Sequence, residues 1–106
     1  MSGQISHEVA VRVRVQIPSP LRSYTEGAAT VAVAVPLLAP ESPPTLQSVL
    51  AALDGAFPGI RFRMIDEQGA VRPHIKLFVG GVLARNLRTT VQAGTDVMIV
   101  AALSGG

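Results

Sequence analysis

The last six residues of the sequence hold its most specific chemical feature. They run Ala101-Ala102-Leu103-Ser104-Gly105-Gly106, so two glycines follow a short segment of small residues and one leucine. Because glycine has no Cβ, such a segment can enter a narrow channel of another protein, with an extended reach of roughly 20 Å. The α-carboxylate of Gly106 is ionised at neutral pH and is a poor electrophile. Acyl chemistry at Gly106 therefore requires activation, for example by ATP to give an acyl-adenylate.

Few other residues have types and spacing suited to chemistry. The sequence has no cysteine, which excludes disulfides, iron–sulfur clusters, cysteine zinc sites and a thiol nucleophile on this chain. His7 and His74 are far apart in sequence, and no serine, cysteine or carboxylate lies at motif spacing from His74. Asp66 and Glu67 are adjacent in a predicted turn, where carboxylates are usually solvated. We therefore assign no catalytic residue and no metal site.

The size and composition indicate one globular domain. The chain has 106 residues, of which 48% are hydrophobic and 15% charged. A chain of this length can bury roughly two-thirds of its unfolded surface, which is enough for one core. The high hydrophobic and low charged content excludes a disordered chain. The net charge of +2 and only four aromatic residues are not the basic, stacking surface of a nucleic-acid-binding protein.

No segment has the pattern of a targeting signal or a membrane anchor. Residues 1–8 lack the basic and apolar regions of a signal peptide. The longest apolar stretch, residues 28–39, is too short for a bilayer span of about 20 residues. We expect a soluble, cytoplasmic protein with neither a membrane nor a nucleic acid as partner.

Alternating apolar residues predict strands at both ends of the chain. In residues 9–17 the valines and Ile17 point one way, and the other face carries Ala10, Arg12, Arg14 and Gln16. Residues 31–35 alternate again, so the two runs are expected to form an antiparallel hairpin. Further strands are predicted at residues 74–79, 82–84 and 96–101, and the Gly-Gly pair at 80–81 suits a tight turn with positive φ.

One helix is predicted between the second and third strands. Thr45 can cap it, and Pro58-Gly59 ends it. A single apolar stripe has helical spacing along this segment, formed by Leu46, Val49, Leu50, Leu53 and Phe57. Residues 60–65 fit either a short helix or an extended segment.

This order of elements predicts an α+β fold of the ubiquitin-like β-grasp type. One main helix packs across one face of a mixed sheet of four to five strands, and the last strand can lie centrally beside the first. A small five-stranded barrel is the alternative, and the strong helix stripe favours the grasp. We expect a β-grasp domain over residues 9–101, with flexible tails at 1–8 and 102–106.

Several segments of the chain resemble the MoaD/ThiS family of ubiquitin-like sulfur carriers, over about residues 9–106. The matching segments are Ile17-Pro18-x-x-Leu21-Arg22-x-x-Thr25-x-Gly27, Thr45-Leu46, Phe57-Pro58-Gly59-Ile60, Asp66-Glu67-x-Gly69, Phe78-Val79-x-Gly81 and Ala102-Leu103-Ser104-Gly105-Gly106. The terminal segment after a strand is the most specific. The first segment resembles the branch that feeds cysteine biosynthesis more than the small subunit of molybdopterin synthase.

The resemblance implies a carrier rather than a stand-alone enzyme. It implies that the chain binds no cofactor. It also implies an activating partner, which is a ubiquitin-activating-enzyme-like adenylyltransferase and sulfurtransferase. This partner uses ATP with Mg²⁺ to adenylate Gly106. Sulfur then replaces AMP to leave a thiocarboxylate, while Leu103, Ser104 and Gly105 thread the partner's active site. In the cysteine branch, the implied sulfur acceptor is a PLP-dependent cysteine synthase, and a metal-dependent C-terminal protease acts after it. In the molybdopterin branch, the acceptor is the large subunit of molybdopterin synthase, and this chain would be the small subunit of that enzyme.

Other residues are candidates for partner binding on the sheet face away from the helix. Phe78 is expected there, with Arg12, Arg14 and Met98 beside it. Exposed aromatic residues can anchor a partner, and arginines can dock an acidic surface. The alternative is that loops cover Phe78 and that the arginines lie on a solvated face.

Two other functions remain open from the sequence. A ubiquitin-like modifier would use the same Gly106 acyl-adenylate and join it to a lysine amine. A non-catalytic β-grasp interaction module would not use its tail. In that module, deletion of Gly105 and Gly106 would leave function intact.

Overall fold

The computed structural model describes residues 10–37, 39 and 41–102, and it contains five strands and one main helix. Two short 3₁₀ helices, η2 and η3, lie in the connections. The elements in chain order are β1 (Ala10–Gln16), η2 (Ser19–Leu21), β2 (Thr30–Pro36), α1 (Leu46–Ala56), η3 (Arg61–Arg63), β3 (Ile75–Val79), β4 (Val82–Ala84) and β5 (Val97–Ala101).

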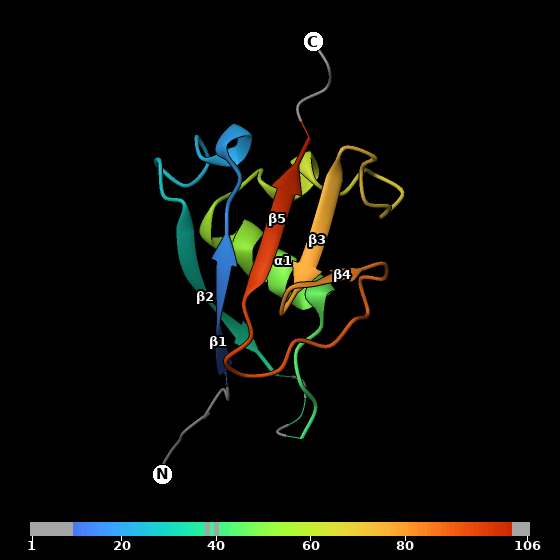
Figure 1. Cartoon of the computed structure of the whole chain (residues 1–106). Coiled ribbons are helices and arrows are strands. Elements are labelled where there is room, and N and C mark those ends of the chain that lie inside the picture. The colour runs from blue at the N-terminus through green and yellow to red at the C-terminus, as the bar shows by residue number, and fades with distance from the viewer. Residues whose placement is uncertain (1–9, 38, 40, 103–106) are drawn as a thin grey trace.

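The five strands form one mixed sheet in the order β2-β1-β5-β3-β4, with α1 across one face (Figure 1). β1 and β5 are parallel, and the other neighbouring pairs are antiparallel. The last strand therefore lies between the first and the third, as expected from the sequence. The fold is a ubiquitin-like β-grasp, and the barrel alternative is wrong because the sheet has two free edges, β2 and β4.

The alternating pattern of the N-terminal hairpin produces one buried face. Val13 and Val15 are fully buried, and Val33 and Val35 lie on the paired strand with 4% and 0% of their surface exposed. The register opposes Val13 to Val33 and Val15 to Val31. Because successive side chains of a strand alternate between the two faces, burial of the valines leaves Arg12 and Arg14 on the open face.

Helix α1 begins and ends at the predicted positions. Thr45 Oγ1 accepts from the Ser48 backbone N–H at 3.2 Å, and Ser48 Oγ accepts from the Thr45 N–H at 2.9 Å, which makes a reciprocal capping box. The predicted stripe is buried from Leu46 to Leu53, while Phe57 is half-buried at the C-cap. The helix thus contributes its apolar side to the core beneath the sheet.

The segment left undecided by its sequence forms a compact turn. Residues 61–63 are the 3₁₀ helix η3, and Ile60, Met64 and Ile65 around it are fully buried. Asp54 holds this turn to the end of α1, since its Oδ1 accepts from the backbone N–H groups of Gly59 at 3.1 Å and Arg61 at 3.0 Å.

Two predicted strand starts are early by one residue. β3 begins at Ile75 rather than His74, because a turn closes there with the Ile75 N–H donating to the Arg72 carbonyl at 2.9 Å. β5 begins at Val97 rather than Asp96, whose carbonyl accepts from the Gly80 N–H at 2.9 Å. Gly80 and Gly81 have φ of 58° and 83°, which confirms the predicted turn.

No helix among residues 10–37, 39 and 41–102 has the length and apolar character needed to cross a bilayer. The predicted tail at 1–8 and residues 103–106 of the predicted C-terminal tail lie outside the described residues.

Candidate functional site

The base of the C-terminal tail is held by the centre of the sheet. β5 is bonded to β1 on one side and to β3 on the other, and Ala101 pairs with Ile75. The Ala102 N–H then donates to the His74 carbonyl at 2.8 Å. A strand with neighbours on both sides has a well-defined direction, so the sheet determines where the chain leaves the domain. Among the predicted tail residues, Leu103, Ser104, Gly105 and Gly106 lie outside the described residues.

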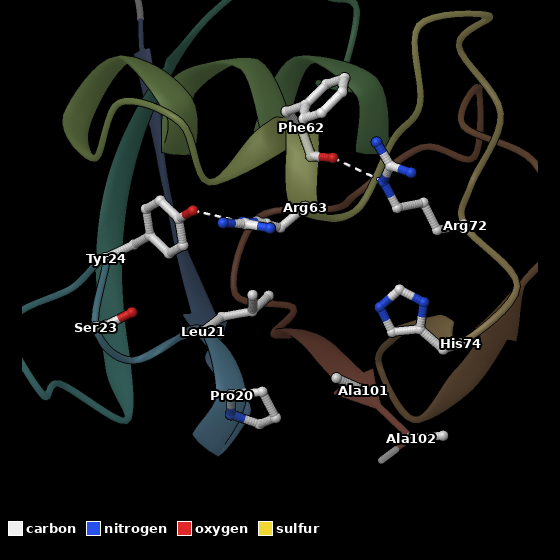
Figure 2. Close-up of a pocket in the computed structure, with 10 residues that line it drawn as sticks. All are labelled: Pro20, Leu21, Ser23, Tyr24, Phe62, Arg63, Arg72, His74, Ala101 and Ala102. Carbon is white, nitrogen blue, oxygen red and sulfur yellow. Dashed lines mark hydrogen bonds between the residues drawn. The ribbon is translucent and has the colours of Figure 1, made fainter. Parts of the chain in front are cut away.

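A pocket of about 540 Å³ opens at the base of the tail. Four segments that are distant in the sequence line it, as Figure 2 shows. The lining residues are Pro20, Leu21, Ser23, Tyr24, Phe62, Arg63, Arg72, His74, Ala101 and Ala102. We call it the tail-base pocket. Its lining residues lie at the C-terminal end of β5, which is the upper end of the sheet in Figure 1, beside η2 and η3.

The two arginines of the tail-base pocket are held on aromatic side chains. Arg63 Nε donates to the Tyr24 hydroxyl, and its guanidinium carbon lies 5.8 Å from the centre of the Tyr24 ring. Arg72 Nε donates to the Phe62 carbonyl at 2.7 Å, and its guanidinium carbon lies 4.5 Å from the Phe62 ring centre. Cation–π contacts of this kind orient a guanidinium as well as stabilise it. Both side chains are therefore positioned before any ligand arrives.

A glycine allows one of these aromatic rings to take its place. Gly59 has φ of 98°, and a Cβ built on it would lie 3.2 Å from Tyr24 Cε1. A side chain at position 59 would thus be strained and would press on the ring that supports Arg63. The Pro58-Gly59 pair, which the sequence identifies as a helix end, also shapes this pocket.

The tail-base pocket has no signature in the sequence. No local pattern connects Tyr24, Arg63, Arg72 and Ala102. The His74 side chain is exposed, and it also lines the pocket. Only the pairing of β3 with β5 and the turn at η3 place these residues together.

The predicted partner face lies on the other side of the sheet from α1. Phe78 and Met98 are direct cross-strand neighbours on β3 and β5, and Met98 is also opposite Gln16 of β1. Phe78 is half-buried, whereas Met98 and Val100 are each 37% exposed. The structure therefore brings two of the four candidates into one apolar row.

The other two candidates lie further toward the start of β1. Arg14 Nη2 forms an ion pair with Asp96 Oδ2 at 3.1 Å, so part of its charge is already balanced within the chain. Arg12 is exposed and lies with Arg14 along the same shallow depression. The partner of Arg14 is 82 residues away in sequence, and no spacing rule indicates it.

Among the part of the chain that the structure describes, no three histidine or carboxylate side chains gather in a way that could hold a metal ion.

Solved structures of small carrier and modifier proteins share this fold. CysO of Mycobacterium tuberculosis is 27% identical, with a TM-score of 0.72 over 86% of this chain and 99% of that chain. Small archaeal modifier protein 1 of Haloferax volcanii is 25% identical, with a TM-score of 0.72 over 90% and 99%. The chain resembles the MoaD/ThiS-like ubiquitin-like sulfur carriers.

This similarity supports a carrier or modifier rather than a catalyst. The structure of a complex of BexX with CysO from Amycolatopsis orientalis also matches in fold, with 24% identity, a TM-score of 0.73, and coverage of 89% of this chain and 99% of that chain. No protein-family model and no curated protein sequence matches the chain.

Proposed function

We propose that this chain carries sulfur as a thiocarboxylate on Gly106. The observation that supports the proposal is the position of β5, which is the central strand of the sheet. The hydrogen bond between Ala102 and His74 anchors its end. The residues that follow in the sequence are Leu103-Ser104-Gly105-Gly106. A carrier needs a stable domain for recognition and a narrow segment for delivery. The fold supplies the first, and the residues after β5 have the composition for the second.

The chemistry requires two displacement steps on the Gly106 carboxyl group. In the first, a carboxylate oxygen attacks the α-phosphorus of ATP, which gives an acyl-adenylate and releases pyrophosphate. In the second, a sulfide-level sulfur nucleophile attacks the acyl carbon, and AMP leaves with the bonding electron pair. The product is a thiocarboxylate. The adenylyltransferase binds the ATP and Mg²⁺ that the first step uses, and neither step needs a catalytic residue on the carrier.

The absence of cysteine agrees with this assignment. The chain has no thiol on which sulfur could be held as a persulfide. Sulfur carried covalently by this protein must therefore reside at the terminal carboxyl group or not at all.

The partners we propose are an adenylyltransferase and a sulfur-accepting synthase. CysO occurs in a complex with BexX in the matching structure, which supports a role exercised through partner proteins. We favour the cysteine branch, with a PLP-dependent synthase and then a metal-dependent protease, because of the Ile17–Gly27 motif and the similarity to CysO. The molybdopterin synthase large subunit is the next candidate. We also propose that the reaction takes place in the cytoplasm, where ATP is available.

The deciding experiment is a mass measurement of the C-terminal peptide. The protein is isolated from its native cell, and a second sample is incubated with its adenylyltransferase, ATP and a sulfide source. Fragmentation must place the added mass on Gly106, because oxidation of any of the three methionines nearly equals an oxygen-to-sulfur exchange. A matched chain lacking Gly105 and Gly106 is the control and should gain no sulfur.

The outcomes separate the candidate functions. Sulfur on Gly106 supports the carrier, and a cysteinyl adduct at the same residue identifies the cysteine branch. The similarity to small archaeal modifier protein 1 favours the modifier as second candidate, and Gly106 joined to a lysine of another protein would support it. An unmodified Gly106 in both samples would refute the carrier and leave an interaction module.

A further inference from the structure

The tail-base pocket has the features of a site for anions. Each of its guanidinium groups uses Nε in a bond to Tyr24 or Phe62. The two terminal nitrogens of each carry four N–H donors, and none of these donates to an acceptor among the described residues. Two guanidinium forks fixed on aromatic rings are suited to bind carboxylates by paired hydrogen bonds.

The charge of the pocket is not balanced by neighbouring acids. None of the ten lining residues is aspartate or glutamate. Over residues 10–37, 39 and 41–102, the one ion pair that the structure contains joins Arg14 to Asp96, on a different part of the surface. The positive charge of Arg63 and Arg72 is thus open to a ligand from outside this part of the chain.

The position of the pocket at the base of the tail indicates which partner protein can supply that ligand. Ala101 and Ala102 are part of its lining, and Gly106 lies four residues after Ala102 in the sequence. Four extended residues span at most about 14 Å. A protein that takes Gly106 into its active site must therefore bring the mouth of that site close to the tail-base pocket. Phe62 is 55% exposed at the same place and adds an apolar contact.

We propose that the tail-base pocket docks a carboxylate-bearing segment at the mouth of the adenylyltransferase. This inference rests on the proposed function and adds the chemistry of the partner. Arg63 and Arg72 receive one or more aspartate or glutamate side chains, Phe62 packs against their apolar neighbours, and His74 holds the base of the tail through its carbonyl. Recognition and delivery of the tail are thereby coupled at one point of the carrier.

The test compares thiocarboxylation kinetics of the wild-type chain and an Arg63→Gln/Arg72→Gln double variant. The enzyme is the adenylyltransferase that modifies the wild-type chain, and the rate of Gly106 thiocarboxylate formation is measured against carrier concentration. We expect the KM for the carrier to rise about tenfold or more, with kcat changing less than about twofold, since the lost ion pairs contribute to docking and not to acyl transfer. The KM of the wild-type chain should rise with salt more steeply than that of the variant.

Two controls accompany the double variant. Arg88→Gln removes one exposed positive charge away from the pocket and should change KM less than about twofold. Arg63→Lys/Arg72→Lys keeps the charge without the planar fork and should recover part of the loss. Far-UV circular dichroism and the urea midpoint verify that each variant keeps the fold.

The possible results of this kinetic test distinguish the docking site from the proposed function. A wild-type KM for the double variant, or an equal effect from Arg88→Gln, would overturn the docking site and leave the proposed function intact. A lower KM or a faster rate would also overturn it, because it would mean that the tail itself occupied the pocket and was released. A wild-type chain that gains no sulfur would overturn the proposed function and this inference together.

Discussion

Substitution of Ile99 tests how strongly the core stabilises β5, the strand that leads into the C-terminal tail. It lies in the middle of β5 with 2% of its surface exposed, on the face that packs toward α1. Ile99→Ala removes three carbons, which costs about 2.4 kcal/mol at about 0.8 kcal/mol each. The cavity adds to this loss, so we expect the free energy of unfolding to fall by about 3–4 kcal/mol. A domain of ordinary stability remains folded after that loss.

The matched control is the next residue on the same strand. Val100 is 37% exposed on the opposite face, and Val100→Ala should cost less than about 1 kcal/mol. Urea unfolding is followed by far-UV circular dichroism, because the chain has no tryptophan and one tyrosine. Equal losses for the two variants, or a loss below about 1 kcal/mol for Ile99→Ala, would refute the assignment of these faces.

Three further substitutions test the turn and cap geometry by the same unfolding assay. Thr45→Ala removes the 3.2 Å capping bond to the Ser48 N–H and should cost about 1 kcal/mol, and an unchanged midpoint would argue against the capping box. Gly59→Ala and Gly81→Ala both place a Cβ at positive φ, which costs about 1–2 kcal/mol. Only the first meets a neighbour, Tyr24 at 3.2 Å, so it should lose more stability; the reverse order would contradict the packing described here.

Much of the fold follows from local patterns in the sequence. The alternation around Val13 and Val33 and the stripe from Leu46 to Leu53 each specify one buried face, and both are buried in the structure. The boundaries at His74 and Asp96 were each wrong by one residue. Hydrogen bonds of turns, rather than side-chain polarity, decide where those strands begin.

In the candidate site, too, some features could be predicted from the sequence and others could not. The role of Gly106 follows from residue type and family resemblance, and it stays a prediction. The partner face was also proposed from alternation, but the ion pair that ties Arg14 to Asp96 was not, because the two residues meet only when β5 inserts beside β1. A charge counted as available in the sequence is thereby partly balanced in the fold.

The sequence by itself determined the strands and the main helix, the cap at Thr45, the exclusion of thiol chemistry on this chain and the Gly105-Gly106 pair. These depend on neighbours within a few residues or on composition alone. Only the tertiary structure decided that Arg63 and Arg72 lie on aromatic rings beside Ala102. The physical reason is that this arrangement needs β5 between β1 and β3, and such long-range pairing is specified by the packing of the whole core.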